Sequence, residues 1–175
     1  FDTAHERTVA RTAYLSANPH TEGFHDGRYP VDAGAFARLD NVFDWGFDEE
    51  HGTVPPGVLT DHAVAFLRDE SPDRTILHYM QPHTPYRGLD MDGIRQSSTG
   101  TFRETVWDLI LSGKLTRDRA WELYLDNLRW ALDEVAVLLR SVNADRVVIT
   151  ADHGECFDEF GAYGHSPSGG FDALL

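Results

Sequence analysis

The sequence predicts an α/β fold, in which helices alternate with the strands of a mostly parallel sheet. Three short β-prone or apolar runs bounded by turn residues support this prediction: residues 12–17, 75–80 and 146–150. Apolar residues at helical spacing lie between these runs, and the alternation of strand and helix is typical of α/β domains. The third run, RVVIT, lacks polar alternation, which indicates a strand buried on both faces of a parallel sheet.

The first predicted strand, residues 12–17, ends at Asn18-Pro19-His20, which is a turn signal. Residues 21–56 are rich in Gly, Asp and Pro and contain scattered aromatic side chains. Such aromatic residues more often fill a core than contact a ligand. We therefore expect a packed irregular connection there.

A helix is predicted over residues 59–69, with Thr60 or Asp61 as its N-cap. The second predicted strand, 75–80, ends at Gln81-Pro82, where proline cannot continue the hydrogen-bond ladder.

Two further helices are predicted, a short one over 102–111 and a long one over 115–142. The long helix carries an apolar stripe at spacings of three and four, which predicts its core-facing side: Trp121, Tyr124, Leu125, Leu128, Leu132, Val135 and Leu139. Residues 143–145 break this helix before the third strand begins.

The charge of the chain limits its partners. Fifteen basic residues stand against 29 acidic ones, which gives a formal net charge of -14. This charge disfavours nucleic acid and anionic membrane as partners. The acidic excess, with Lys114 as the only lysine, resembles proteins of halophilic organisms, although an ordinary acidic protein fits the same composition.

The remaining composition is that of a globular protein. Cys156 is the only cysteine, so no internal disulfide forms. No apolar run approaches the ~18 residues of a membrane span, and residues 1–10 do not resemble a signal peptide. We expect a cytoplasmic location unless a leader lies outside the sequence, and we expect the chain to be a fragment cut at both ends.

Two polar clusters follow predicted strands, where parallel sheets bind ligands. Residues 81–86 (QPHTPY) follow the second strand, and residues 151–155 (ADHGE) follow the third. Asp152 and His153 offer an oxygen and a nitrogen ligand, and Gly154 lets the backbone turn so that both face one metal ion. The alternative is that Asp152 caps a turn and His153 is merely solvated.

His83 lies between two prolines that are expected to hold its loop extended. A fixed imidazole there can donate a hydrogen bond to a sulfate or phosphate oxygen, or pass a proton to a leaving group. The alternative is a rigid polyproline-like loop with a surface histidine. His78, inside the predicted strand, is expected to be a hydrogen-bonded core histidine.

Together these segments resemble the sulfatase family of the alkaline phosphatase superfamily. HYMQPHTPY is similar to the family's His-x-Pro-Tyr loop, VVITADHGECFDEFGAYGH to its strand and metal loop, and TAYLSANPH to the strand after its nucleophile segment. SPSGGFDALL resembles the stretch that leads into a further strand. The resemblance spans nearly the whole chain.

The resemblance implies an alkaline-phosphatase-like α/β/α sandwich with a mostly parallel sheet, here incomplete, with residues 1–175 as the C-terminal part of one catalytic domain. It implies metal-dependent hydrolysis of a small-molecule or glycan sulfate ester. Asp152 and His153 would be the metal ligands, with Ca²⁺ expected and Mg²⁺ or Mn²⁺ as alternatives. His83 would contact the sulfo group, and His165 would contact an oxyanion oxygen.

The sequence departs from the family in one central feature. Sulfatases carry a Cys/Ser-x-Pro-x-Arg nucleophile motif and an N-terminal acidic pair, and neither is found here. Cys156 lies outside such a motif, and residues 71–74 (SPDR) have the wrong spacing. We therefore expect the chain alone to be inactive. A phosphoester or phosphonoester hydrolase, a phosphoryl transferase of the same superfamily, and a catalytically silent anion-binding scaffold remain as alternatives.

Overall fold

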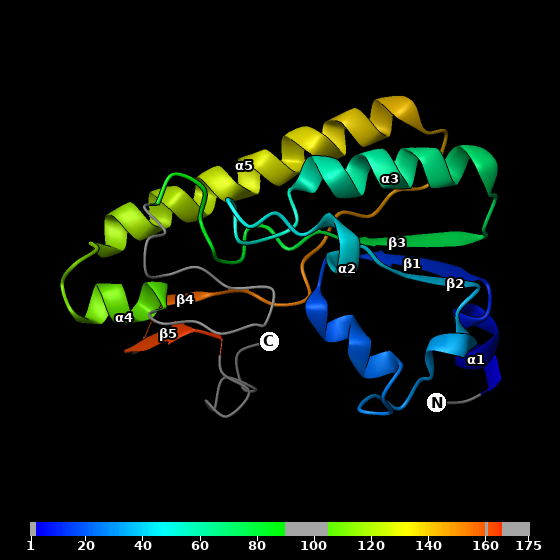
Figure 1. Cartoon of the computed structure of the whole chain (residues 1–175), viewed down its shortest axis with the longest axis horizontal. Helices are drawn as coiled ribbons and strands as arrows, with labels where there is room; N and C mark the ends of the chain where they lie inside the picture. Colours follow the sequence, from blue (N-terminus) through cyan, green and yellow to red (C-terminus); the bar gives the residue numbers. More distant parts are fainter. Residues whose placement is uncertain (1–2, 90–104, 160, 166–175) are drawn as a thin grey trace.

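The computed structural model describes residues 3–89, 105–159 and 161–165, and it shows an α/β arrangement (Figure 1). A parallel sheet of three strands and an antiparallel pair of strands are the two sheets of these residues. The elements, in chain order, are α1 (Thr3–Val9), β1 (Thr12–Ser16), the 3₁₀ segments η1 (Pro19–Phe24) and η2 (Ala33–Ala35), β2 (Arg38–Asn41), α2 (Phe43–Gly46), α3 (Pro56–Asp69), β3 (Arg74–His78), α4 (Val106–Leu111), α5 (Arg117–Ser141), β4 (Cys156–Glu159) and β5 (Ala162–Gly164).

β1 is the central strand of the parallel sheet, whose order is β2-β1-β3. Leu15 of β1 pairs with Leu77 of β3 on one side and with Asp40 of β2 on the other. The predictions of β1 and β3 are confirmed. β2 lies within residues 21–56, which were expected to be irregular, so that expectation was wrong for this part. The sequence RLDN has no apolar alternation, and it forms a strand because it pairs with β1.

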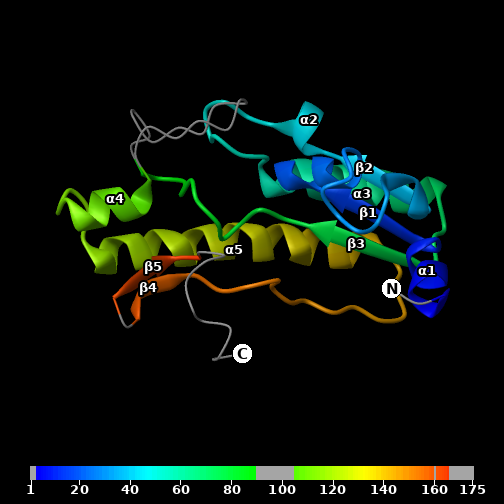
Figure 2. The ribbon, with the colours of Figure 1, turned by 90° about the horizontal axis from the view of Figure 1, so that it is seen from below.

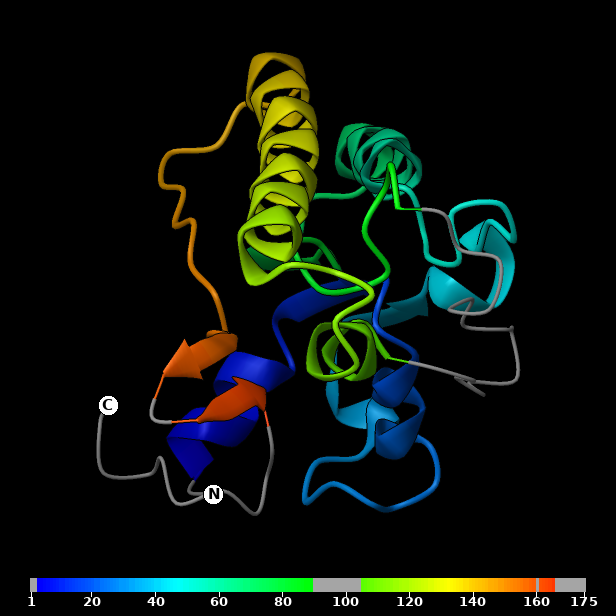
Figure 3. The same cartoon turned by 90° about the vertical axis from the view of Figure 1, so that its left-hand side faces the viewer.

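Helices α3 and α5 lie together on one face of this sheet, as Figures 1 and 3 show. Leu15 packs there against Leu59 and Ala63 of α3 and Leu138 of α5 in one buried cluster. Burial of a leucine side chain contributes about 1.5–3 kcal/mol, so this cluster is a main source of stability. Tyr14 points to the other face, where it packs against the rings of Phe24 and Phe36.

α3 begins three residues earlier than predicted. Its N-cap is Pro55 and Pro56 occupies the first turn, where the fixed φ of proline suits a helix and its missing N–H costs nothing. The expectation of a cap at Thr60 or Asp61 was therefore wrong. Thr60 is buried inside the helix, and its hydroxyl forms a hydrogen bond with the hydroxyl of Tyr79 at 2.8 Å.

The long helix α5 is confirmed, but the side that it buries differs from the predicted stripe. Trp121, Leu132 and Leu139 of that stripe are exposed. The buried stripe lies to one side of it: Ala120, Leu123, Asn127, Ala131 and Leu138. The small side chains of Ala120 and Ala131 allow close approach to neighbouring elements, and this packing decides the orientation where apolar residues occur on both sides of a helix.

The prediction of a buried strand at 146–150 was wrong. This segment has no regular secondary structure, and its side chains are exposed, with Val148 at 84%. Figure 3 shows the segment, in orange, running down the side of α5 that faces away from α3. An apolar run becomes a strand only where a neighbouring backbone pairs with it, and within the described residues β3 pairs with β1 alone.

The short helix α4 confirms the prediction for residues 106–111, and residues 102–104 of that prediction lie outside the described residues. The stretch 166–175, which was expected to lead into a further strand, also lies outside them. Thr105 and Asp108 cap its first turn reciprocally, each side chain bonding the other's backbone N–H. Among the helices of the described part of the chain, none has both the length and the apolar character that crossing a membrane requires.

Candidate functional site

The loop after β3 carries His83 and turns back on itself. The N–H of His83 donates to the carbonyl of Met80 at 3.0 Å, which closes a turn. The Gln81-Pro82 and Thr84-Pro85 bonds on either side are both cis. The expectation of an extended loop was wrong, because the hydrogen bond from His83 to Met80 closes a turn. The imidazole is nevertheless fixed, because its Nδ1 forms a 2.7 Å hydrogen bond with the carbonyl of Thr84.

Asn127 of α5 binds this loop through three hydrogen bonds. Its side chain is fully buried. Its Oδ1 accepts from the N–H of Arg87 at 3.0 Å, and its Nδ2 donates to the carbonyls of Pro85 at 3.0 Å and His83 at 3.3 Å. A helix residue thus bonds three backbone groups of an irregular loop, and it gives the buried carbonyl of Pro85 a hydrogen-bond partner.

A hairpin of β4 and β5 positions the second half of the site (Figure 2). It is anchored by Phe157, which is buried among the rings of Trp107, Trp121 and Tyr124. Gly164 ends the hairpin with a φ of +73°, and a Cβ there would lie 2.7 Å from Nε1 of Trp107. Glycine is therefore required at this position, and it directs the chain so that His165 follows at the site.

His83, Glu155 and His165 converge on one point. One ligand atom from each of the three side chains lies within 4.8 Å of the others. Nδ1 of His165 donates to Oε1 of Glu155 at 2.7 Å, and Nε2 of His83 lies 4.0 Å from the same oxygen. The ring of His153 lies beside this group, with its centroid 4.1 Å from that of His165.

Asp152 lies at the outer side of this cluster. Its Oδ2 is 3.8 Å from Nε2 of His153 and 3.9 Å from Nε2 of His78. His78 forms a 2.6 Å hydrogen bond with the hydroxyl of Tyr14, which confirms the expected hydrogen bond, but it is half-buried rather than in the core. Two ligands that are each about 2.0–2.6 Å from one ion lie at most about 5 Å apart. The separations of Asp152 from His153 and from His78 are both below this limit.

Burial shapes the electrostatics of the cluster. The side chain of Glu155 is only 6% exposed, and its Oε2 has no hydrogen-bond partner among the residues that the structure describes. An unsatisfied buried polar group costs about 1–3 kcal/mol, and a charged one costs more. Burial lowers the pKa of His83, which favours its neutral form. Burial also raises the pKa of Tyr86 and Tyr124, and the charge of Glu155 adds to both shifts.

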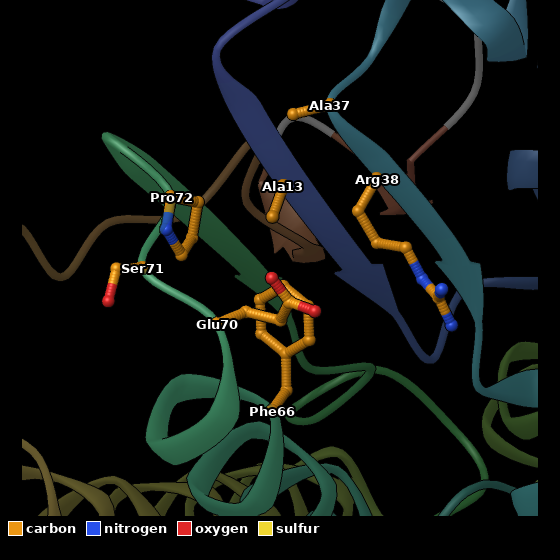
Figure 4. A pocket seen from close by; sticks show the side chains of 7 residues that line it. All are labelled: Ala13, Ala37, Arg38, Phe66, Glu70, Ser71 and Pro72. Carbon is orange, nitrogen blue, oxygen red and sulfur yellow. The ribbon is translucent and has the colours of Figure 1, made fainter.

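A separate hollow lies at the other end of the sheet. It has a volume of about 290 Å³ and is lined by Arg38, Phe66, Glu70 and Pro72, among others (Figure 4). These residues are at or before the amino ends of β2 and β3, whereas His83 follows the carboxyl end of β3. The hollow is therefore remote from the histidine cluster and brings no comparable set of metal-binding side chains together.

Of the four residues that the sequence indicates as a site, His83, His153 and His165 lie in ring contact and Asp152 lies beside them. Sequence reasoning missed Glu155 and Asn127. The signal for Glu155 was its place directly after Asp152-His153-Gly154, and the signal for Asn127 was a polar residue amid the helix's apolar positions. No protein-family model, no curated protein and no solved structure matches this chain.

Proposed function

We propose that this chain is part of a metal-dependent hydrolase of sulfate esters, built on an alkaline-phosphatase-like α/β/α fold. One observation carries the proposal: the loop at 81–86 and the segment 152–165, which resemble two separate sulfatase motifs, converge on one cluster although about 70 residues separate them in sequence. The parallel sheet places the first of these loops at its carboxyl end, where α/β folds bind ligands.

Asp152 and His153 are the proposed ligands of the divalent ion, which when bound would neutralise the oxyanion and polarise the ester. His83 and His165 line the side on which the oxyanion would bind. Nδ1–H of His83 donates to the carbonyl of Thr84, so Nε2 is the nitrogen that faces the cluster, and Nε2 must take up a proton before it can donate to the oxyanion. Asp152 is mostly exposed, which leaves it accessible to an ion from solvent.

The nucleophile is proposed to come from a segment beyond the printed sequence, of the Cys/Ser-x-Pro-x-Arg kind. Cys156 does not fill this role, because it lies in β4 on the hairpin rather than at the carboxyl end of a parallel strand. The choice between sulfur and phosphorus esters rests on the resemblance alone, since an Asp-His metal pair binds both tetrahedral anions.

The proposal is tested by assaying 4-nitrophenyl sulfate, 4-nitrophenyl phosphate and a phenyl phosphonate ester with Ca²⁺, Mg²⁺ or Mn²⁺. We expect no turnover by the 175-residue chain, and turnover by a longer chain that also carries the nucleophile motif. In that longer chain, Asp152→Asn should remove both the ion and the activity. His83→Ala should retain the ion at Asp152 and reduce turnover by roughly 10²–10⁴-fold.

Asp145→Asn is the matched control, because Asp145 is an exposed carboxylate earlier on the same segment. It should change neither metal binding nor turnover. Turnover by the 175-residue chain that survives Asp152→Asn would show that the chemistry lies on other residues. Tight sulfate binding without turnover in the longer chain would instead support the silent scaffold.

A further inference from the structure

We propose that His83, Glu155 and His165 form a binding site for a transition-metal ion of the Zn²⁺ class, distinct from the Asp152-His153 pair. The proposal does not depend on hydrolase activity, because it needs only three side chains of this chain. In a hydrolase, an ion held by these side chains would bind an oxyanion oxygen of the ester, in place of direct contacts from His83 and His165.

The first support is the state of the His83 ring. A carbonyl oxygen only accepts hydrogen bonds, so the 2.7 Å contact with Thr84 fixes the proton of His83 on Nδ1. The neutral ring then presents the lone pair of Nε2, the atom that lies 4.0 Å from Glu155. Metal-binding histidines show this arrangement, in which a carbonyl or carboxylate holds one ring nitrogen and the metal takes the other.

The second support is Glu155, whose side chain is almost completely buried. Oε1 receives one hydrogen bond from His165, and Oε2 has no partner in the described part of the chain. A buried carboxylate with a free oxygen is a poor structural group but a suitable ligand, since a cation would compensate the missing interactions. This observation is independent of the histidine geometry and points to the same place.

The third support is the composition of the three ligands. Two imidazole nitrogens and one carboxylate oxygen suit Zn²⁺ and similar ions, whereas Ca²⁺ prefers six to eight oxygen ligands. Three protein ligands leave a coordination position open, which is the arrangement of ion-binding sites that also take up water or an anion. His83 and His165 are partly accessible, so an ion can enter from solvent.

The proposal is tested by titrating the metal-free 175-residue chain with Zn²⁺ and by X-ray absorption spectroscopy of the Zn²⁺ form. We expect one tight ion per chain and a first shell with two imidazole nitrogens at about 2.0–2.1 Å plus oxygen. The spectrum reads the ligands of the unaltered protein, so it decides the question even if a variant fails to fold. A shell with fewer than two imidazoles would overturn the proposal.

Variants assign the ligands. Glu155→Gln, which keeps the side chain's shape, and His165→Ala should each weaken Zn²⁺ binding by on the order of 10²-fold, with far-UV circular dichroism confirming the fold. His25→Ala, which removes an exposed histidine, should leave the affinity unchanged, and Asp152→Asn should weaken it far less than Glu155→Gln does. An equal loss in Asp152→Asn would place the ion at the pair proposed for hydrolysis and contradict this site, while leaving the hydrolase proposal standing.

Discussion

Asn127 is the residue on which the position of His83 depends most directly. Its amide bonds one backbone N–H and two carbonyls of the loop that follows β3, and it does so from a rigid helix. Within the loop, the N–H of His83 bonds the carbonyl of Met80 and its Nδ1 bonds the carbonyl of Thr84. Asn127 adds the bonds that tie the loop to α5. Asn127 is therefore a positioning residue for the site rather than a ligand of it.

Replacing Asn127 with alanine should lower the free energy of unfolding by about 1–3 kcal/mol, because the buried carbonyl of Pro85 and two partly buried backbone groups lose their partner. Asp126→Ala is the control, since the neighbouring Asp126 forms only an exposed ion pair with Arg87; such a pair is worth about 0–1 kcal/mol. Urea unfolding followed by circular dichroism measures both. Equal losses in the two variants would show that Asn127 does not support the loop.

At the scale of elements, the sequence predicts those helices and strands whose apolar pattern is contained within the segment itself. β1, β3, α3 and α5 follow from short apolar runs and helical spacing that act within each segment. β2 and the β4–β5 hairpin escaped prediction because their strands are defined by partners: β2 is polar and pairs along β1, and the hairpin is held by Phe157 among three aromatic rings. For the same reason the site could not be predicted in full: no residue near Glu155 in the sequence indicates that Glu155 lies close to His83.

The segment 146–150 offers a direct test of local pattern against tertiary context. Its sequence is typical of a central strand, yet Val148 is exposed. Val148→Asp should therefore change the free energy of unfolding by no more than about 0.5 kcal/mol, as exposed substitutions usually do. Thermal or urea unfolding measures the difference.

Leu15→Asp is the matched control, because Leu15 is fully buried in the central strand β1. It places a charge in the core and should prevent folding. If Val148→Asp were as damaging as Leu15→Asp, the run would be buried as a strand, as its sequence suggests.

On the scale of the whole molecule, the strongly negative net charge of the chain contrasts with the two histidines gathered at the cluster of His83, Glu155 and His165. The cluster gathers His83 and His165 around the buried carboxylate of Glu155, whereas the other acidic residues among the chain's 29 lie outside it. A net charge of -14 repels an anionic ester at long range. Salt reduces this repulsion, so affinity for sulfate at the proposed site, measured by titration, should rise between dilute buffer and physiological ionic strength before competition by salt anions sets in.

The same net charge makes stability depend on salt. Repulsion among the carboxylates weakens the compact state, and screening shortens its range from about 10 Å at 0.1 M salt to about 3 Å at 1 M. We therefore expect the melting temperature to rise markedly between 0.1 M and 2 M KCl, as measured by circular dichroism. Because concentrated salts also stabilise many proteins by exclusion from their surface, the rise alone does not identify repulsion as the cause.

A charge-reduced variant separates the two causes. Changing Glu49, Glu50, Asp61 and Asp133, which are all exposed, to Gln or Asn removes four negative charges while leaving the core intact. If repulsion is the cause, this variant melts higher than the natural chain in 0.1 M KCl and gains less on going to 2 M. Equal gains by both proteins would mean that salt acts by exclusion alone, and the acidic surface would then be no adaptation to high salt.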